Sequence, residues 1–156
     1  EIAYAEIHMK TIEREMKELI AADSNICRNY KLLTSIKGVG PITAIVMLCS
    51  TLNFTKITDH RKFACYCGLA PFEHSSGTSV RGGCHTSSMA NRDIKVQLNR
   101  SALIAIRCDP QLKAYYERKV AEGKHKFSVL NAVRAKIAAR CFAVVRRGTP
   151  YVALQI

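Results

Sequence analysis

The sequence predicts a mainly α-helical domain, and three observations support this fold class. Apolar residues recur at steps of three and four over most of the chain, as on the buried face of a helix. Pro41, Pro110 and Gly123 stand where such segments begin or end. Of the 156 residues, 48% are hydrophobic, which is enough for a buried core. No run approaches the ~18 apolar residues needed to cross a bilayer.

Residues 1–23 are predicted to be the end of a coiled-coil-like helix, and residues 24–156 a separate helical domain. In the helix of residues 1–23, the positions that flank the apolar seam carry Glu6, Glu13 and Glu15 but no Lys or Arg. A homodimeric coiled coil would therefore gain little from these flanking positions. The helix could continue an upstream coil, lie on a basic neighbour, or dock on its own domain. The seam is Ile2, Ala5, Met9, Ile12, Met16 and Leu19.

The stretch "LLTSIKGVGPITAIVMLCSTL" predicts two helices joined by a tight turn at Gly38 and Gly40. Pro41 suits the first position of the second helix, and Ala44 allows the two helices to approach closely. This spacing is that of a helix-hairpin-helix, whose glycines expose backbone N–H groups to a DNA phosphate. Lys37 stands beside the turn. An ordinary helical hairpin with a glycine cap would show the same spacing.

Between this hairpin and the next long helix, "TDHRKFACYCGLAP" predicts a short helix with Thr58 as N-cap and Gly68 as its stop. Residues 72–90 then form a long Ser/Gly-rich loop without helical periodicity. A small β-hairpin over "TSVRGGCHTS" is compatible with its alternation. Loops of this length inside a compact domain are usually functional.

Three further helices are predicted, from Asn91, from Asp109 to Gly123, and from about Ser128. Basic residues lie around the apolar faces of the first and the last. A solvated helix surface is the ordinary explanation, but the repetition with few acids between favours a binding surface. These residues are Arg92, Lys95, Arg100 and Arg107, then Arg134, Lys136, Arg140, Arg146 and Arg147.

The charge balance indicates the kind of partner. Lys and Arg number 24 against 12 Asp and Glu, a net charge of +12. The first 23 residues hold six of the acids but only three of the bases, so the excess belongs to the helical domain. A polyanion such as DNA or RNA is therefore the expected partner, ahead of an anionic membrane surface.

The seven cysteines are predicted to be free thiols in a reducing compartment, mostly buried in apolar helical segments. A metal site made by Cys65, Cys67, Cys84 and His85 is the alternative. Its spacing matches none of the usual C-x2-C zinc arrangements, so no metal site is predicted.

Taken in order, "IKGVGPITA", "FACYCGLAPFEHSSGTSVRGG", "ANRDIKVQLNRSALIAIRCDPQLKAYYERKVAEGKHK" and "VVRRGTPY" resemble the C-terminal catalytic domain of a known family. This is the Piv/bridge-recombinase family of insertion-sequence transposases (insertion-sequence family one-ten, with the 116 and 902 elements). The resemblance covers roughly residues 28–151, and the Gly-Leu-Ala-Pro and Ser-Gly segment is its most specific part. One departure is Ala90, where a Gly is common in the family.

The resemblance implies a site-specific DNA recombinase that moves an insertion sequence. Such proteins join a RuvC-like domain with four metal-binding carboxylates to a coiled coil and a C-terminal domain with a serine nucleophile. Ser76, directly before Gly77, falls on the nucleophile position, and Ser75 is the second candidate. Arg81 could steady the charge of the phosphate. Glu1 begins inside a helical pattern without a Met, so we expect a fragment of a longer protein.

No cofactor is expected in this chain, and Mg²⁺ is expected in the missing carboxylate domain. The implied partners are DNA, a guide RNA in many members, and further copies of the full-length protein. No membrane partner is expected, and the implied location is the bacterial cytoplasm, at the nucleoid when DNA is bound. Two other readings stay open: a non-catalytic helix-hairpin-helix module that binds nucleic acid, and a zinc-stabilised adaptor.

Overall fold

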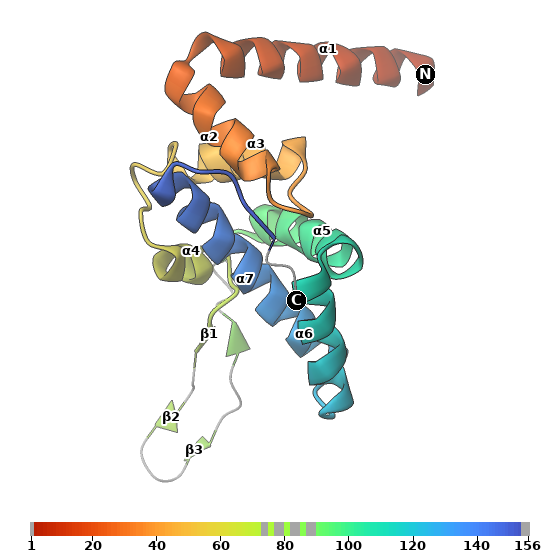
Figure 1. Cartoon of the computed structure of the whole chain (residues 1–156), viewed down its shortest axis with the longest axis vertical. Coiled ribbons are helices and arrows are strands. Elements are labelled where there is room, and N and C mark those ends of the chain that lie inside the picture. Colours follow the sequence, from red (N-terminus) through yellow and green to blue (C-terminus); the bar gives the residue numbers. More distant parts are fainter. Residues whose placement is uncertain (1, 73–74, 77–79, 82–84, 87–89, 154–156) are drawn as a thin grey trace.

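The computed structural model describes residues 2–72, 75–76, 80–81, 85–86 and 90–153, and it describes the four short strands by their backbone pairing. The mainly helical prediction is confirmed (Figure 1). None of the helices in the described ranges is long and apolar enough to cross a membrane. The helices are α1 (Ile2–Ala22), α2 (Ser24–Thr34), α3 (Pro41–Thr51), α4 (His60–Tyr66), α5 (Arg92–Cys108), α6 (Pro110–Ala121) and α7 (Lys126–Arg147).

Helix α1 projects from the rest of the fold and packs against α2, beside the bend at Asp23 (Figure 1). Most of the predicted apolar seam is open to solvent, with Ile2 80% and Met9 61% exposed. Of the seam residues only Met16, near the C-terminal end of α1, is half-buried; Ile20, which is not part of the seam, is half-buried too. Docking of the whole seam on its own domain is therefore not what the structure shows.

Helix α7 forms the centre of the helical body, since α2, α4, α5 and α6 all pack on it. Its inward positions, among them Val133, Ile137 and Cys141, are fully buried and repeat at steps of four. They meet Leu98 and Ala102 from α5, which are also fully buried. The predicted inner faces of these two helices are confirmed.

The two helices predicted on either side of the glycine turn are also present. Gly40 is the N-cap of α3 and Pro41 its first residue, as the sequence indicated. A hydrogen bond between the hydroxyls of Thr43 and Ser101, 2.9 Å long and buried, joins α3 to α5. Gly38 has φ +94° and lies directly against the backbone of α5 near Ser101. The turn is therefore fixed to α5.

Helix boundaries were predicted with two errors. The N-cap of α4 is Asp59, not Thr58, because Asp59 has the extended backbone and its carboxylate accepts a hydrogen bond from the Arg61 N–H at 3.0 Å. Helix α7 begins at Lys126, two residues before the predicted Ser128, after an extended His125.

Two antiparallel strand pairs occur in the Ser/Gly-rich segment. Strand β1 (Pro71–Phe72) pairs with β4 (His85–Thr86), and β2 (Ser75–Ser76) pairs with β3 (Val80–Arg81). The hairpin considered over residues 78–87 would have paired residues 80–81 with residues that follow them. Residues 80–81 pair instead with residues 75–76, which precede them. Strands β2 and β3 lie beyond the helical body (Figure 1).

Candidate nucleic-acid interface

The outward face of α5 carries three of the basic residues that the sequence singled out. Ile94, Leu98 and Ala102 are buried on one side of the helix, and this fixes Arg92 and Arg100 on the exposed side. The exposed Arg107 lies on the same side, about two turns beyond Arg100. We call this side of α5, from Arg92 to Arg107, the α5 face.

The start of α5 is held firmly in place. The Asn91 side chain accepts hydrogen bonds from the Asp93 N–H at 3.1 Å and the Ile94 N–H at 3.2 Å, which caps the helix. The Asn91 N–H donates to the carbonyl of Tyr66 at 3.1 Å, so the end of α4 fixes the beginning of α5. The first basic residues of the α5 face therefore have a rigid support.

A cavity of about 350 Å³ opens at this first part of α5. It is lined by Arg92, Lys95, Val96 and Asn99 from α5 and by Arg134 from α7. Three cations thus converge on one concavity, which is a favourable site for a phosphate. Lys95 is half-buried here, whereas Arg92 is exposed.

Arg134 is fixed in the wall of this cavity by neighbouring amides. Its Nε donates to Asn99 Oδ1 at 3.1 Å, and its Nη1 donates to Asn131 Oδ1 at 3.3 Å. Asn131 in turn donates to the carbonyl of Leu69 at 2.9 Å, two residues before β1. Burial lowers the pKa of Arg134, yet a guanidinium stays charged at neutral pH. The segment with Ser75 and Ser76 therefore leaves the helical body beside this basic cavity.

At the other end, the glycine turn meets the middle of α5. Gly38 packs against Ser101; its neighbour Lys37 is exposed, and so is Arg100, the neighbour of Ser101 on α5. A Cβ on Gly40 would have no atom within 4 Å, so this glycine faces open space at the N-terminus of α3. The turn thus offers the N-terminus of α3 and the exposed Lys37 to solvent.

The predicted binding residues lie on α5 and at the turn that packs on it, but Gly38 faces α5 rather than solvent. We call the set from the cavity at Arg92, along α5, to the turn at Gly40 the basic strip. Arg92 and Arg100 are eight residues apart on α5, which is about 12 Å along the helix axis. Since one DNA strand places a phosphate every ~3.4 Å along its axis, about three or four phosphates would span this distance. The structure brings Arg92 and Lys95 together in the cavity, and it places Lys37, Gly40 and Arg100 at the other end of the strip.

The proposed catalytic residues lie on β2 and β3. Ser75 is opposite Arg81 and Ser76 is opposite Val80 in the strand register. The side chains of these residues, together with Gly77, lie outside what the structure describes. The roles predicted for Ser76, Ser75 and Arg81 stay predictions.

Two residues predicted on the outer basic face of α7 are instead half-buried. Arg134 takes part in the amide cluster above, and Arg140 donates to the fully buried carboxylate of Asp109 at 2.8 Å. Conversely, Asn99 belongs to the cavity although the sequence analysis did not select it. Its position, four residues after Lys95 and seven after Arg92, places it on the same side of the helix and could have indicated its role.

The cysteines only partly follow the prediction. Cys67 and Cys141 are buried, and burial raises the pKa of these thiols to about 11 and about 12, so both behave as apolar core groups. Cys49, Cys65 and Cys108 are exposed instead. Cys84, one member of the alternative metal site, lies outside the described residues. Elsewhere in the described chain, no group of three or more His, Cys, Asp or Glu is arranged to hold a metal.

The fold and the α5 face define a basic helical domain with a surface suited to a polyanion. A comparison with known protein families identifies the family of this domain. The model of the Transposase IS116/IS110/IS902 family matches residues 30–117, more than half of the chain. The chain belongs to this family, and the resemblance noted in the sequence is confirmed at that level.

Relatives of the chain include proteins of several insertion elements. The chain is 39% identical over 121 residues to the "Insertion element IS110 uncharacterized 43.6 kDa protein" of Streptomyces coelicolor, covering 77% of the chain and 29% of that protein. It is 23% identical over 141 residues to the "Pilin gene-inverting protein" of Moraxella bovis, covering 90% of the chain and 44% of that protein. The chain thus spans less than half the length of these relatives.

Proposed function

We propose that this chain is the part of an insertion-sequence transposase that holds DNA and supplies a serine nucleophile for cutting and rejoining strands. The observation that carries the proposal is the basic strip, in which Arg92, Lys95 and Arg134 surround one cavity, Arg100 is exposed further along α5, and the glycine turn packs on the middle of that helix. The serine-bearing strands leave the helical body at one end of this strip. Membership of the transposase family and a relative named for gene inversion support the same function.

The strip is suited to hold DNA by its backbone. Its groups are guanidinium and ammonium ions and a helix N-terminus, all of which bind phosphates without distinguishing bases. A guide RNA would contact the same groups through its own phosphates. The basic strip therefore does not discriminate between DNA and RNA, and we assign that discrimination to other parts of the complex. Assembly of several copies is likewise part of the proposal and rests on the family resemblance.

The proposed chemistry is covalent catalysis by Ser76. Its Oγ attacks the phosphorus of a phosphodiester, the bond from phosphorus to one deoxyribose oxygen breaks, and that oxygen takes up a proton equivalent to the one the hydroxyl loses. A phosphoserine diester keeps the bond energy, so a second sugar hydroxyl can reverse the step and restore Ser76. The described residues do not form a metal site, and the Mg²⁺ that the resemblance implies belongs to a carboxylate domain outside this chain.

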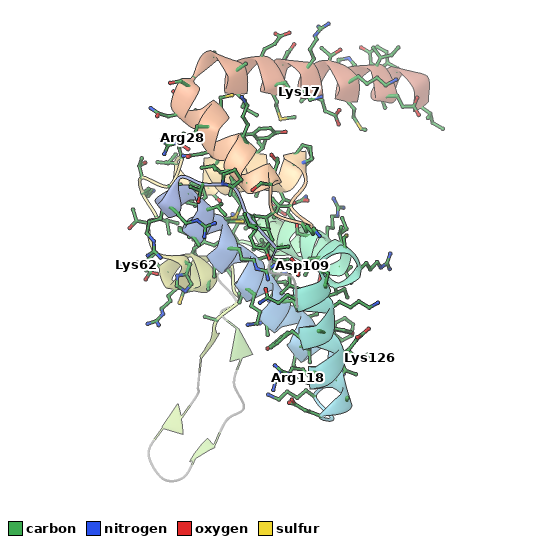
Figure 2. All side chains as sticks on the ribbon, in the orientation of Figure 1. Lys17, Arg28, Lys62, Asp109, Arg118 and Lys126 are labelled. Carbon is green, nitrogen blue, oxygen red and sulfur yellow. The ribbon has the colours of Figure 1, made fainter. Side chains whose placement is uncertain are left out.

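DNA binding is tested by fluorescence anisotropy of a labelled duplex with the 156-residue chain. Replacing Arg92 or Arg100 with Gln should weaken binding roughly fivefold at low salt and should reduce the slope of log affinity against log salt by about one. Lys17→Gln on α1 is the matched control, because it removes the same charge far from the α5 face (Figure 2). Equal affinities for all three variants would exclude the α5 face as the DNA site.

The nucleophile is tested in the whole transposase that carries this chain, with its nucleic acids and Mg²⁺. Ser76→Ala should abolish covalent protein–DNA adducts while leaving DNA binding in place, and Ser75→Ala should reduce activity less. Mass spectrometry of the adduct identifies the linked residue. An adduct that persists in Ser76→Ala would show that this chain binds DNA without acting as the nucleophile, which is the non-catalytic alternative.

A further inference from the structure

A second concave region lies between α6 and α7 and has a volume of about 560 Å³. This is within the range of ~300–1,000 Å³ typical of sites for small organic groups. We call it the α6–α7 groove. Its lining consists of Gln111, Leu112, Ala114, Tyr115, Arg118, Lys136, Ala139 and Arg140.

The α6–α7 groove is separate from the α5 face. Arg134 lines the cavity at α5, whereas Lys136, two residues later on α7, lines the groove. Because successive residues of a helix are turned by about 100°, these two positions point to roughly opposite sides of α7. No residue of the groove belongs to the α5 face.

The groove combines an aromatic ring with unbalanced positive charge. Lys136 Nζ lies 4.5 Å from the centre of the Tyr115 ring, and Arg118 Cζ lies 5.9 Å from it. Within the described chain Lys136 makes no ion pair. The acid beside Arg118 is Glu122, 3.8 Å away, and it is shared with Lys119 at 2.6 Å. One carboxylate thus serves two cations, and the groove keeps a net positive charge.

The remaining wall of the groove is rigid and presents no free acid. Arg140 is held by Asp109 and Gln111 and stacks on the Tyr151 ring, with its Cζ 4.8 Å from the ring centre. The Asp109 carboxylate is fully buried and also accepts hydrogen bonds from the Leu112 N–H at 3.0 Å and the Tyr151 hydroxyl at 3.1 Å. Figure 2 shows Asp109 at the junction of α5 and α6 and Arg118 further along α6.

We propose that the α6–α7 groove binds an unpaired nucleotide of a single strand, with its base against Tyr115 and its phosphate against Lys136 and Arg118. An aromatic ring beside cations is the combination by which proteins hold single-stranded nucleic acid. In a duplex the faces of the bases are stacked on each other, so a ring inside a groove can meet only a base that has left the stack. This site goes beyond the proposed function, which needs only the α5 face and the serine strands.

The test compares three labelled oligonucleotides of one sequence: single-stranded DNA, single-stranded RNA, and the DNA duplex. Their affinities for the 156-residue chain are measured by anisotropy at one salt concentration. The variants are Tyr115→Leu, which keeps an apolar side chain but removes the ring, and Lys136→Gln, which removes one exposed charge. Lys17→Gln again is the matched control. Circular dichroism and melting temperature confirm that each variant is folded.

Both groove variants should lower single-strand affinity about fivefold or more and duplex affinity less than twofold, while Lys17→Gln changes neither beyond twofold. A larger loss with DNA than with RNA, or the reverse, would identify the natural strand. Equal losses on single strand and duplex, or no loss at all, would overturn the proposal. So would saturable binding of a mononucleotide such as dTMP without binding of the oligonucleotides. Because duplex binding is tested separately with Arg92 and Arg100, the groove can fail while the proposed function stands.

Discussion

Gly38 and Gly40 stand two residues apart in one turn, yet the structure predicts opposite consequences for the same substitution. A Cβ added to Gly38 would lie 2.6 Å from the Ser101 carbonyl oxygen and 2.8 Å from the Ala105 Cβ. Gly38 also has φ +94°, which L-residues avoid. A Cβ added to Gly40 would meet nothing within 4 Å, and its φ of −86° suits any residue.

The cost of Gly38→Ala follows from two terms. A left-handed backbone costs an L-residue about 1–2 kcal/mol, and overfilling a packed contact costs about 1–3 kcal/mol. A central value of about 3 kcal/mol should lower the melting temperature by roughly 6–12 °C in a domain of this size. Gly40→Ala has two opposing effects. Alanine restricts the unfolded chain, which stabilises the fold, but it is a weaker N-cap than glycine, which destabilises α3. The free energy of unfolding should therefore change by less than about 1 kcal/mol.

Thermal and urea unfolding of the two variants, followed by circular dichroism, measure this difference directly. Equal stability of Gly38→Ala and Gly40→Ala would refute the close packing of the turn on α5. A bulkier Gly40→Leu variant extends the assay to binding. It should remain folded and bind duplex DNA more weakly, because its side chain would stand at the exposed N-terminus of α3. Unchanged DNA affinity in a folded Gly40→Leu would show that the turn is only structural.

Two further predictions concern stability and assembly. Burial alone would raise the pKa of Asp109, but hydrogen bonds from the Leu112 N–H and the Arg140 guanidinium hold that pKa below its usual value. The ionised Asp109 therefore stabilises the folded protein at neutral pH, and this stabilisation is lost progressively as the pH falls below about 4. Asp109→Asn should therefore cost about 3 kcal/mol in urea unfolding at neutral pH and less at about pH 3; an equal cost at both would mean that the charge is irrelevant. Met9→Glu and Ile12→Glu on α1 should weaken self-association of the whole protein in sedimentation velocity, whereas unaltered assembly would exclude the seam as the interface.

The positions of the helices could be predicted because their ends depend on a few neighbouring residues. Asn91, Asp109 and Gly123 each act where the sequence indicated, since an N-cap or a left-handed glycine needs only local geometry. The error between Thr58 and Asp59 has the same origin. Both residues can cap a helix, and the choice depends on which of them has the extended backbone.

The partners of the charged residues could not be predicted in the same way. Periodicity placed Arg134 and Arg140 off the innermost face of α7, but it could not show that Asn99 and Asp109 approach them from other helices. The α6–α7 groove could not be predicted from the sequence for a related reason. Tyr115 and Lys136 come from different helices, and the packing of the core sets the orientation of these helices relative to each other. The sequence showed the net charge and left open which cations remain available to a ligand.

Helix α7 fixes the position of the two proposed sites relative to each other. Arg134 on one side of this helix lines the cavity of the α5 face, and Lys136 on the opposite side lines the α6–α7 groove. Helix α7 is rigid, because four other helices pack on it and its inner side chains are fully buried. A duplex on the α5 face cannot also fill the groove without bending around the helix. If both proposals hold, the domain keeps a duplex and an unpaired strand on opposite sides of one fixed support, and the distance between them is set by the core rather than by the nucleic acid.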